Sequence, residues 1–123
     1  MGSGSSGYNI RGTRGSRDDG YRHVDGFTTK LNAGAQGKHI PGHKNYEPGR
    51  SIFRGSLADA QALIDRFAGT GTKVGTNKER VDFGEVIGIY VNEEGTVREP
   101  TTVGQIHYSK NGAHIVPGRP KSS

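Results

Sequence analysis

One stretch of the chain, SLADAQALIDRFAGTG (residues 56–71), has a clear helical period. Its apolar side chains recur at a spacing of about 3.6 residues and share one face: Leu57, Ala60, Leu63, Ile64 and Phe67. Ser56 is a favourable N-cap, Asp59 stands at the third helical position as in a capping box, and Gly69 suits the position that ends a helix. The sequence therefore predicts one amphipathic helix that packs its apolar stripe on a core.

The chain beyond this helix has the composition of β-strands. Residues 70–79 are interpreted as a polar loop, and RVDFGEVIGIYV (80–91) is rich in β-branched and aromatic residues. A returning stretch follows at 96–109, with Pro100 expected at an edge, a bend or a strand start. With a last strand at AHIV (113–116), the predicted fold is α+β: an N-terminal loop and a helix packed on one face of a three- to four-stranded antiparallel sheet.

The chain has room for one domain. Of its 123 residues, 29% are hydrophobic, 21 are glycine and none is cysteine, so we expect a thin core without disulfide bonds. We expect a tag remnant at 1–7, a mobile lead-in at 8–29, the domain itself at 30–120 and a tail at 121–123. No run of about 18 apolar residues is present, so a transmembrane helix is not expected. The net charge of +5 suits an anionic partner, such as nucleic acid, an anionic membrane or an acidic protein, and it also suits simple solubility.

The segment around Asn111 and Gly112 predicts a β-hairpin whose two faces differ. A two-residue loop at these positions pairs Lys110 with Ala113. Because alternate residues of a strand share a face, one face is apolar and carries Ile106, Tyr108, Ala113 and Ile115. The other face is polar and carries Gln105, His107, Ser109 and His114. This polar face is either an ordinary solvated surface or one side of a functional site.

Two further histidines lie four residues apart in GKHIPGHKNY (37–46). Pro41 and Gly42 stand between them and oppose a helix, so His39 and His43 are expected in a loop. The glycines of this region allow such a loop to approach a ligand closely. If the loop crosses the polar face of the sheet, it brings its histidines and lysines beside the histidines of the hairpin.

This set of side chains suits the cleavage of RNA without a metal ion. RNA supplies its own nucleophile, the 2′-hydroxyl, and the protein must supply a base, an acid and positive charge beside the phosphate. Histidine serves as base and acid near neutral pH, and lysine or arginine offsets the developing charge. A zinc site is an alternative, although the chain has no cysteine and no His-Glu-x-x-His motif. Ser109 as a nucleophile is a weaker alternative, because no nucleophile elbow surrounds it.

Three stretches together resemble the polymorphic toxin type 50 domain: NAGAQGKHIPGHKNYEPGRSIF (32–53), VDFGEVIGIYV (81–91) and TTVGQIHYSKNGAHIVPGRP (101–120). The resemblance covers about residues 31–120, nearly all of the expected domain. It implies a ribonuclease toxin with the fold shared by barnase, the EndoU nucleases, the colicin-type tRNA nucleases and RelE. In that fold the active site lies on the open face of the sheet.

The resemblance also carries over a set of site residues. The prominent polar positions of the family match Lys38, His39, His43, Asn45, Tyr46, His107, Tyr108, Ser109 and His114. We expect His43 and His107 to form the acid/base pair, with His39 or His114 positioning the phosphate. The other side chains expected at the substrate are Lys44, Thr102 and Lys110. Tyr108 has a second interpretation, as a half-buried tyrosine of the apolar face.

The expected function is therefore that of a metal-independent endoribonuclease toxin module, which leaves a 2′,3′-cyclic phosphate and a 5′-hydroxyl and needs no cofactor. The resemblance to a toxin family further implies two partners, RNA and an acidic immunity protein that covers the basic cleft. We expect a monomer without membrane contact, secreted or delivered, that acts in the cytoplasm of a target cell. The alternative is a non-catalytic basic module that binds nucleic acid or a phage particle.

Overall fold

The computed structural model describes residues 20–121. The expected tag remnant, residues 8–19 of the expected lead-in and the last two residues of the tail lie outside this range. Within it, two helices and nine strands follow one another: β1 His23–Val24, β2 Phe27–Thr28, α1 Ala33–Gly37, β3 Ile52–Phe53, α2 Leu57–Phe67, β4 Thr72–Lys73, β5 Lys78–Asp82, β6 Gly88–Val91, β7 Arg98–Thr101, β8 Val103–Ser109 and β9 Gly112–Pro117.

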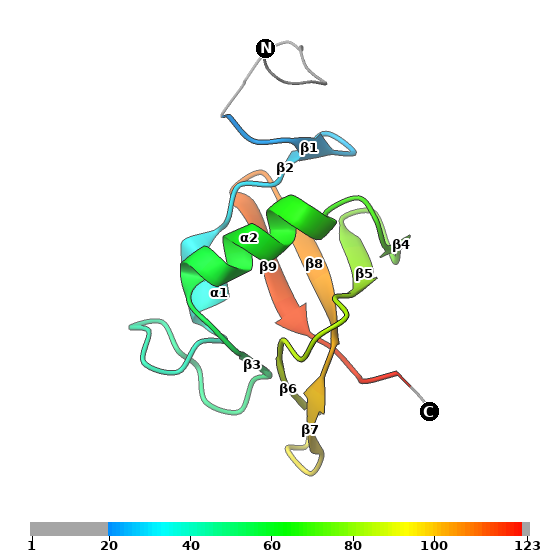
Figure 1. The fold of residues 1–123 in the computed structure, drawn as a ribbon. Helices are drawn as coiled ribbons and strands as arrows, with labels where there is room; N and C mark the ends of the chain where they lie inside the picture. Colours follow the sequence, from blue (N-terminus) through cyan, green and yellow to red (C-terminus); the bar gives the residue numbers. More distant parts are fainter. Residues whose placement is uncertain (1–19, 122–123) are drawn as a thin grey trace.

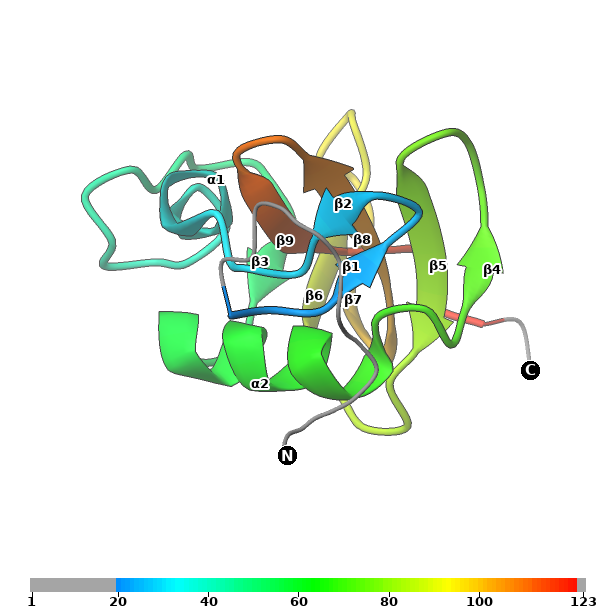
Figure 2. The same ribbon diagram turned by 90° about the horizontal axis from the view of Figure 1, so that it is seen from above.

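The strands form three antiparallel sheets. The largest, called the main sheet below, has the order β4-β5-β8-β9, and the smaller sheets have the orders β3-β6-β7 and β1-β2. Helix α2 crosses one face of the main sheet (Figure 1), and the view from above shows α1 beyond the β9 edge (Figure 2). The predicted α+β class and the antiparallel pairing are confirmed. No helix in the range 20–121 is long and apolar enough to cross a membrane.

The predicted helix is confirmed together with its end signals. Ser56 and Asp59 make both reciprocal hydrogen bonds of a capping box at the N-terminus of α2. The chain leaves the helix through Gly69, whose φ of +92° is readily accessible only to glycine. The buried side of α2 carries Ala60 and Ile64, and both residues have no exposed surface.

The predicted extents of two segments are wrong. The stretch 80–91 is not continuous: β5 ends at Asp82, β6 begins at Gly88, and the two strands belong to different sheets. The chain bends between them because Gly84 takes a φ of +79° and donates its N–H to the Asp82 carboxylate at 3.0 Å. The expected polar loop at 70–79 contains β4 and the start of β5. Pro100 lies in β7 at the edge of its sheet, as expected.

The register predicted for the last hairpin is also wrong. The loop residues are Lys110 and Asn111, and the strand pairing places Ser109 opposite Gly112 and His107 opposite His114. Neither loop residue has the positive φ that a type I′ Asn-Gly turn requires. Instead, the Ser109 hydroxyl accepts the Asn111 N–H at 3.1 Å and donates to the Gly112 carbonyl at 3.0 Å. The error amounts to two residues, so the predicted division into an apolar and a polar face is retained.

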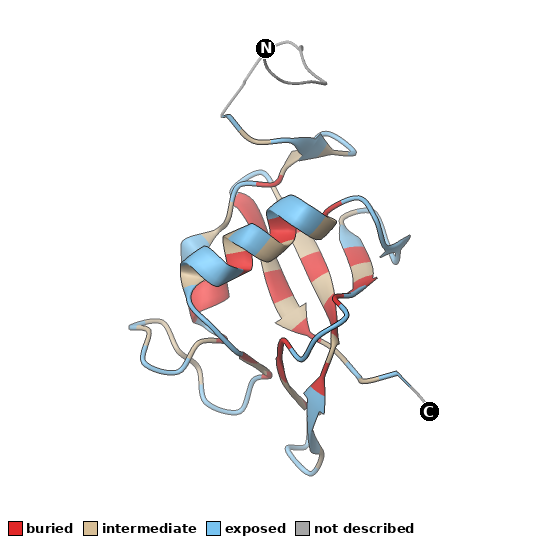
Figure 3. Cartoon of the chain, viewed as in Figure 1, coloured by how far each residue is buried: buried red, intermediate tan, exposed pale blue. Residues whose placement is uncertain are grey.

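The apolar face of the main sheet forms the core with α2. Along β8 and β9, buried residues alternate with partly exposed ones (Figure 3). The buried set under α2 includes Phe53, Val81, Phe83, Ile87, Ile106, Tyr108, Ala113 and Ile115. The opposite face of the main sheet is called the open face below, because Gln105, His107 and His114 keep part of their surface exposed there.

The free edge of β9 is closed by the segment that precedes it in sequence by about eighty residues. Leu31 forms a parallel bridge with Ala113. Further along, the buried side-chain amide of Gln36 donates to the Ile115 carbonyl at 2.9 Å and accepts the Ile115 N–H at 2.7 Å. One glutamine side chain thus takes the place of a neighbouring strand and fixes α1 on the sheet.

The hairpin β1–β2 lies within residues 20–29, which were expected to belong to a mobile lead-in. The Arg22 guanidinium donates to the carbonyls of Ala68 and Asp65 at the C-terminal end of α2, at 3.1 and 2.7 Å. The Phe27 ring stacks on Tyr108 with 6.0 Å between centroids. These contacts hold the hairpin on the same side of the main sheet as α2 and leave the open face clear of it.

Replacing Gln36 with alanine removes both hydrogen bonds to Ile115 and leaves two buried backbone groups without partners. Since each such group costs about 1–3 kcal/mol, we expect the free energy of unfolding to fall by about 2–5 kcal/mol. Urea unfolding followed by far-ultraviolet circular dichroism measures this change. Gln61→Ala is the matched control, because that half-buried amide also bonds two backbone groups, but where water can replace it. Equal losses in the two variants would contradict the assigned role of Gln36.

Candidate active site

Three imidazole rings lie together on the open face. His107 of β8 and His114 of β9 are directly opposite each other in the strand register, with 5.1 Å between ring centroids and an edge-to-face orientation. His39, from the turn after α1, lies nearly parallel to His114 at a centroid distance of 6.0 Å. These three residues are called the histidine cluster below. Loop and hairpin therefore meet on one side of the sheet.

His39 reaches the cluster because both its backbone and its ring are fixed. Its carbonyl accepts the Phe53 N–H at 2.8 Å, and its ring Nδ1 bonds the Ser51 carbonyl at 2.8 Å. Ser51 is itself bonded through its hydroxyl to the N–H and carbonyl of Val91 in β6. His39 is only 4% exposed. The ring is thus a buried support that faces His114 rather than a side chain open to solvent.

The hydrogen bonds define which ring nitrogens carry protons. A carbonyl oxygen only accepts, so His39 must donate from Nδ1. In the orientation that the Gln105 amide has in the structure, its oxygen lies 3.1 Å from Nε2 of His107. This contact assigns the proton to Nε2 and the lone pair to Nδ1. For His114, no hydrogen-bond partner of either ring nitrogen is present between residues 20 and 121. The cluster therefore holds two oriented imidazoles and one that is available to a ligand.

The surroundings favour the neutral form of all three rings. Burial is the largest cause, and it lowers the pKa of His107 to about 4, with the charge of Lys78 and the neighbouring His39 adding to the effect. Burial likewise lowers the pKa of His114 to about 4, with His107 next in importance. The pKa of His39 is lowered by burial, against the opposing effect of its bond to Ser51. An imidazole that is neutral at pH 7 can accept a proton, as a general base must.

Positive side chains surround the cluster. Lys78 is the cross-strand neighbour of His107, and the charges of Lys38 and Arg50 act on His114. Arg50 forms an ion pair with Glu47, whereas Lys38 and Lys78 have no carboxylate partner in the described part of the chain. The cluster thus combines neutral imidazoles with uncompensated positive charge, which is an environment suited to an anion.

His43 lies apart from the cluster. Its ring packs directly on Gly37, where an added Cβ would lie 2.3 Å from the ring atoms, and its Nδ1 accepts the Asn45 N–H at 3.0 Å. The Asn45 side chain in turn donates to the Gly34 carbonyl at 3.2 Å. Among residues 20–121, no ring contact links His43 to the other histidines. The structure therefore brings together His39, His107 and His114, and it does not bring His43 to them.

Tyr108 lies on the opposite face of the sheet, among the core residues. Its hydroxyl donates to the buried Glu79 carboxylate at 2.5 Å, and burial with this bond raises the pKa of the phenol strongly. The same carboxylate accepts the N–H groups of Gly69 and Gly71, at 3.0 and 2.6 Å. Tyr108 thus belongs to the structural side of the sheet, in line with its second interpretation.

The remaining expected residues are spread around the site. Ser109 is engaged in the hairpin turn, and Lys110 is exposed at its tip. Thr102 sits at the break between β7 and β8, away from the cluster, where its hydroxyl bonds Asp82. Exposed Lys44 and half-buried Tyr46 follow His43 in the loop.

Two residues at the site were not expected from the sequence. Lys78 was placed in a polar loop, so its position opposite His107 was not expected. Gln105 was assigned to the polar face but given no role, and it now orients His107. The sequence KERVD gives little signal of a strand, because Glu79, which is buried in the structure, is charged like its neighbours. Among the described residues, no group of three or more His, Cys, Asp or Glu side chains has an arrangement that holds a metal ion.

A comparison with known protein families assigns the chain to a family of toxins. The profile of the Bacterial toxin 50 family matches residues 31–117, which is most of the chain and includes the whole histidine cluster. The chain therefore belongs to the Bacterial toxin 50 family. A search of curated proteins finds no significant match.

The low pKa values make the stability of the domain depend on pH. His107 and His114 protonate near pH 4 when folded and near 6.5 when unfolded, so the unfolded chain binds more protons between these values. We therefore expect the melting temperature to fall as the pH is lowered from about 7 to about 5. Calorimetry should show a smaller fall in a double variant, His107→Gln with His114→Gln. An equal fall in both proteins would contradict the low pKa values.

Proposed function

We propose that this toxin domain is a metal-independent endoribonuclease that cleaves RNA by transesterification. The observation that carries the proposal is the histidine cluster: two imidazoles from paired strands and a third behind them, among cations on the open face. RNA provides the attacking 2′-hydroxyl, so the protein has only to move two protons and stabilise the charge that develops on the phosphate. Each of these tasks has a suitable side chain within the cluster or beside it.

In this proposal His107 is the general base. Gln105 holds its Nε2 proton, so the lone pair on Nδ1 is available to take the proton from the 2′-hydroxyl. The low pKa keeps this ring neutral at physiological pH. Lys78, its cross-strand neighbour, lies where it offsets negative charge on the phosphate.

His114 is the general acid, which protonates the leaving 5′ oxygen. A bound phosphate carries a negative charge, and a negative charge beside an imidazole raises its pKa. The substrate thus converts a ring that is neutral in the free protein into a proton donor. His39 is a positioning residue: it lies against His114, and its own orientation is fixed by Ser51.

This assignment differs from the pair expected from the sequence. The expectation joined His43 with His107, but the His43 ring rests on Gly37 and makes no recorded contact with the cluster. His114, which was expected to position the phosphate, stands directly opposite His107 instead. His107 is therefore kept from the expected pair, and His114 replaces His43 as its partner.

The non-catalytic alternative uses the same basic surface without the chemistry. In such a module the cations bind phosphates, and the histidines are surface residues without a proton-transfer role. Binding of RNA without any product would support that alternative over the proposal.

Membership of a toxin family extends the proposal to partners and place of action. We propose delivery of the domain into a target cell, with RNA in the cytoplasm as its substrate. The producing cell then needs an inhibitor, and an acidic immunity protein suits a chain with a net charge of +5.

Incubation of the domain with single-stranded RNA in the presence of EDTA tests the activity. We expect cleavage to persist in EDTA and to leave 2′,3′-cyclic phosphate ends, detected by mass spectrometry. His107→Ala and His114→Ala should each lower the rate about 10²–10⁴-fold, the usual contribution of a general acid or base.

His23→Ala and His43→Ala serve as matched controls in that experiment. His23 is exposed on β1, and His43 lies outside the cluster, so both variants should cleave at close to the rate of the unmodified domain. Loss of activity in His43→Ala with retention in His114→Ala would reverse the assignment of the acid. Loss of cleavage in EDTA would refute the metal-independent mechanism.

The proposed roles also predict two different pH profiles. The profile of kcat/KM reports the free enzyme, where the protonated fraction of His114 falls tenfold for each pH unit above about 4. We therefore expect kcat/KM to decline as the pH rises above about 5. The kcat profile reports the substrate complex, where the phosphate has raised the pKa, so its optimum should lie closer to neutrality. Initial rates on an RNA oligonucleotide measure both, and coincident optima would contradict the role given to the phosphate.

A further inference from the structure

A second basic group lies on the open face, next to the histidine cluster. Arg80 follows Lys78 by two residues on the same side of β5 and pairs in register with Gln105. Two residues of a strand span roughly 7 Å, so Arg80 begins one side-chain row away from the row of Lys78 and His107. Gln105, whose side chain bonds the ring of His107, lies in the same row as Arg80.

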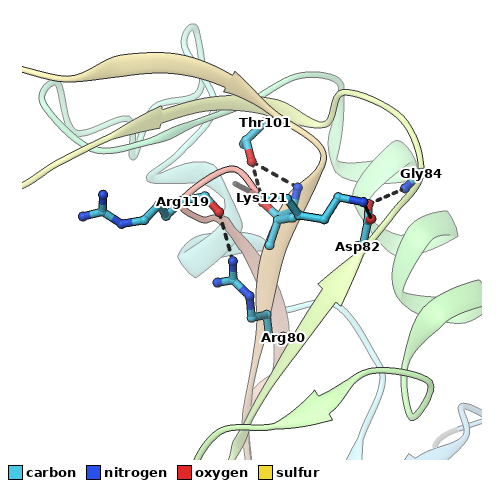
Figure 4. A network of polar contacts seen from close by, with 7 residues as sticks. Arg80, Asp82, Gly84, Thr101, Arg119 and Lys121 are labelled. Atoms are coloured by element: carbon cyan, nitrogen blue, oxygen red, sulfur yellow. Dashed lines mark hydrogen bonds and ion pairs between the residues drawn. The ribbon is translucent and has the colours of Figure 1, made fainter. Parts of the chain in front are cut away.

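The Arg80 side chain extends across β8 towards the end of β9. Its Nη2 donates to the Arg119 carbonyl at 3.1 Å, and its Nη1 lies 3.9 Å from where a Cβ on Gly118 would be (Figure 4). The segment it touches is itself held in place, because the Thr101 hydroxyl donates to the Gly118 carbonyl at 2.8 Å. Arg80 is thus an ordered side chain laid over the open face.

Arg119 completes the group. Its guanidinium carbon lies 5.5 Å from the centre of the Tyr90 ring, and its Nη2 is 3.5 Å from the Tyr90 hydroxyl. A guanidinium that rests on an aromatic face keeps its N–H edges available for an anion. Within residues 20–121, neither Arg80 nor Arg119 has a carboxylate partner, whereas the adjacent Lys121 is paired with Asp82 at 2.6 Å.

We propose that Arg80 and Arg119 form a second phosphate-binding subsite, which binds the backbone of single-stranded RNA next to the phosphate that is cleaved. This inference rests on the proposed function. The two guanidinium groups are positioned by neighbouring backbone and by an aromatic ring, and they lack the compensation that an ordinary surface arginine finds in a carboxylate. Guanidinium groups of this kind bind phosphate oxygens in pairs of hydrogen bonds.

The subsite specifies what kind of substrate the domain uses. Because the cluster and Arg80 occupy successive rows of one sheet face, an RNA strand that reaches both runs along the strands from Lys78 towards Arg80. In-line attack by a 2′-hydroxyl needs a backbone that can rotate freely, which a duplex does not permit. The substrate is therefore an unpaired strand with at least one phosphate beyond the one that is cleaved.

Binding of an uncleavable strand tests the subsite without relying on catalysis. The probe is a fluorescent 2′-O-methyl RNA of about ten nucleotides, titrated at several salt concentrations. The slope of log K against log salt changes by about 0.7 for each phosphate contact that a single strand loses. We expect Arg80→Gln and Arg119→Gln each to reduce the slope by about this amount.

Arg66→Gln is the matched control, because Arg66 is an exposed arginine on α2 that also rests on an aromatic ring, Phe67. Its slope should equal that of the unmodified domain. Slopes unchanged in both subsite variants would overturn the subsite, as would equal reductions in all three variants. Arg119→Gln removes no backbone contact of Arg80, so it remains informative if Arg80→Gln disturbs folding.

Cleavage assays separate this inference from the proposed function. The subsite variants should have a raised KM on an RNA of about ten nucleotides and an unchanged KM on a dinucleotide, which is too short to reach Arg80. Cleavage by the unmodified domain together with equal KM changes on both substrates would refute the subsite alone. Absence of cleavage by the unmodified domain would refute the proposed function.

Discussion

The pair of hydrogen bonds between the Gln36 amide and the backbone of Ile115 is the contact on which the arrangement of this domain depends. It satisfies one residue of the β9 edge and fixes the end of α1 at the same time. His39 follows only three residues later, so the position of its ring is set by where Gln36 is attached. Ser51 then fixes the orientation of that ring. The contact of Gln36 at the edge of β9 thus determines the position of the His39 ring at the open face.

The two faces of the main sheet differ in how their charged groups are compensated. On the helix face, the buried carboxylate of Glu79 is satisfied by Tyr108 and by two backbone N–H groups. On the open face, burial lowers the pKa of the imidazoles and favours their neutral form, and among the described residues Lys38, Lys78 and Arg80 have no carboxylate partner. A charged group that is fully satisfied stabilises the fold. Groups left without compensation are what an anionic ligand can use.

The sequence was sufficient for features that depend on local patterns. The helix from Leu57 to Phe67 has its period, its capping box and its terminal glycine within one stretch. The division of the last hairpin into a core face and a histidine face was also predictable. An error of two residues in the register leaves every side chain on the same face of the sheet. The register itself was not predictable, since the turn depends on the Ser109 hydroxyl and on the close passage of residues 30–32 beside Gly112.

Features that depend on distant contacts could not be predicted from the sequence. The turn between Asp82 and Gly84 is local to RVDFGEVIGIYV. The burial of Phe83 and Ile87 and the division of the stretch between two sheets depend on distant contacts. The choice between His39 and His43 depends on Gly37, which leaves room for one imidazole to pack against α1, while the other is bonded to Ser51. The barnase-like arrangement implied by the resemblance is likewise a matter of tertiary packing, and only its α+β class and antiparallel pairing are established here.

The attachment of residues 30–39 along β9 determines whether the His39 ring lies behind His114. His107 and His114 are neighbours within a continuous hairpin, but their support arrives on a short segment held by a few backbone and amide contacts. Release of that segment would leave the hairpin paired and would remove the His39 ring from behind His114. Under the proposed function, such a chain is inactive until the segment docks again.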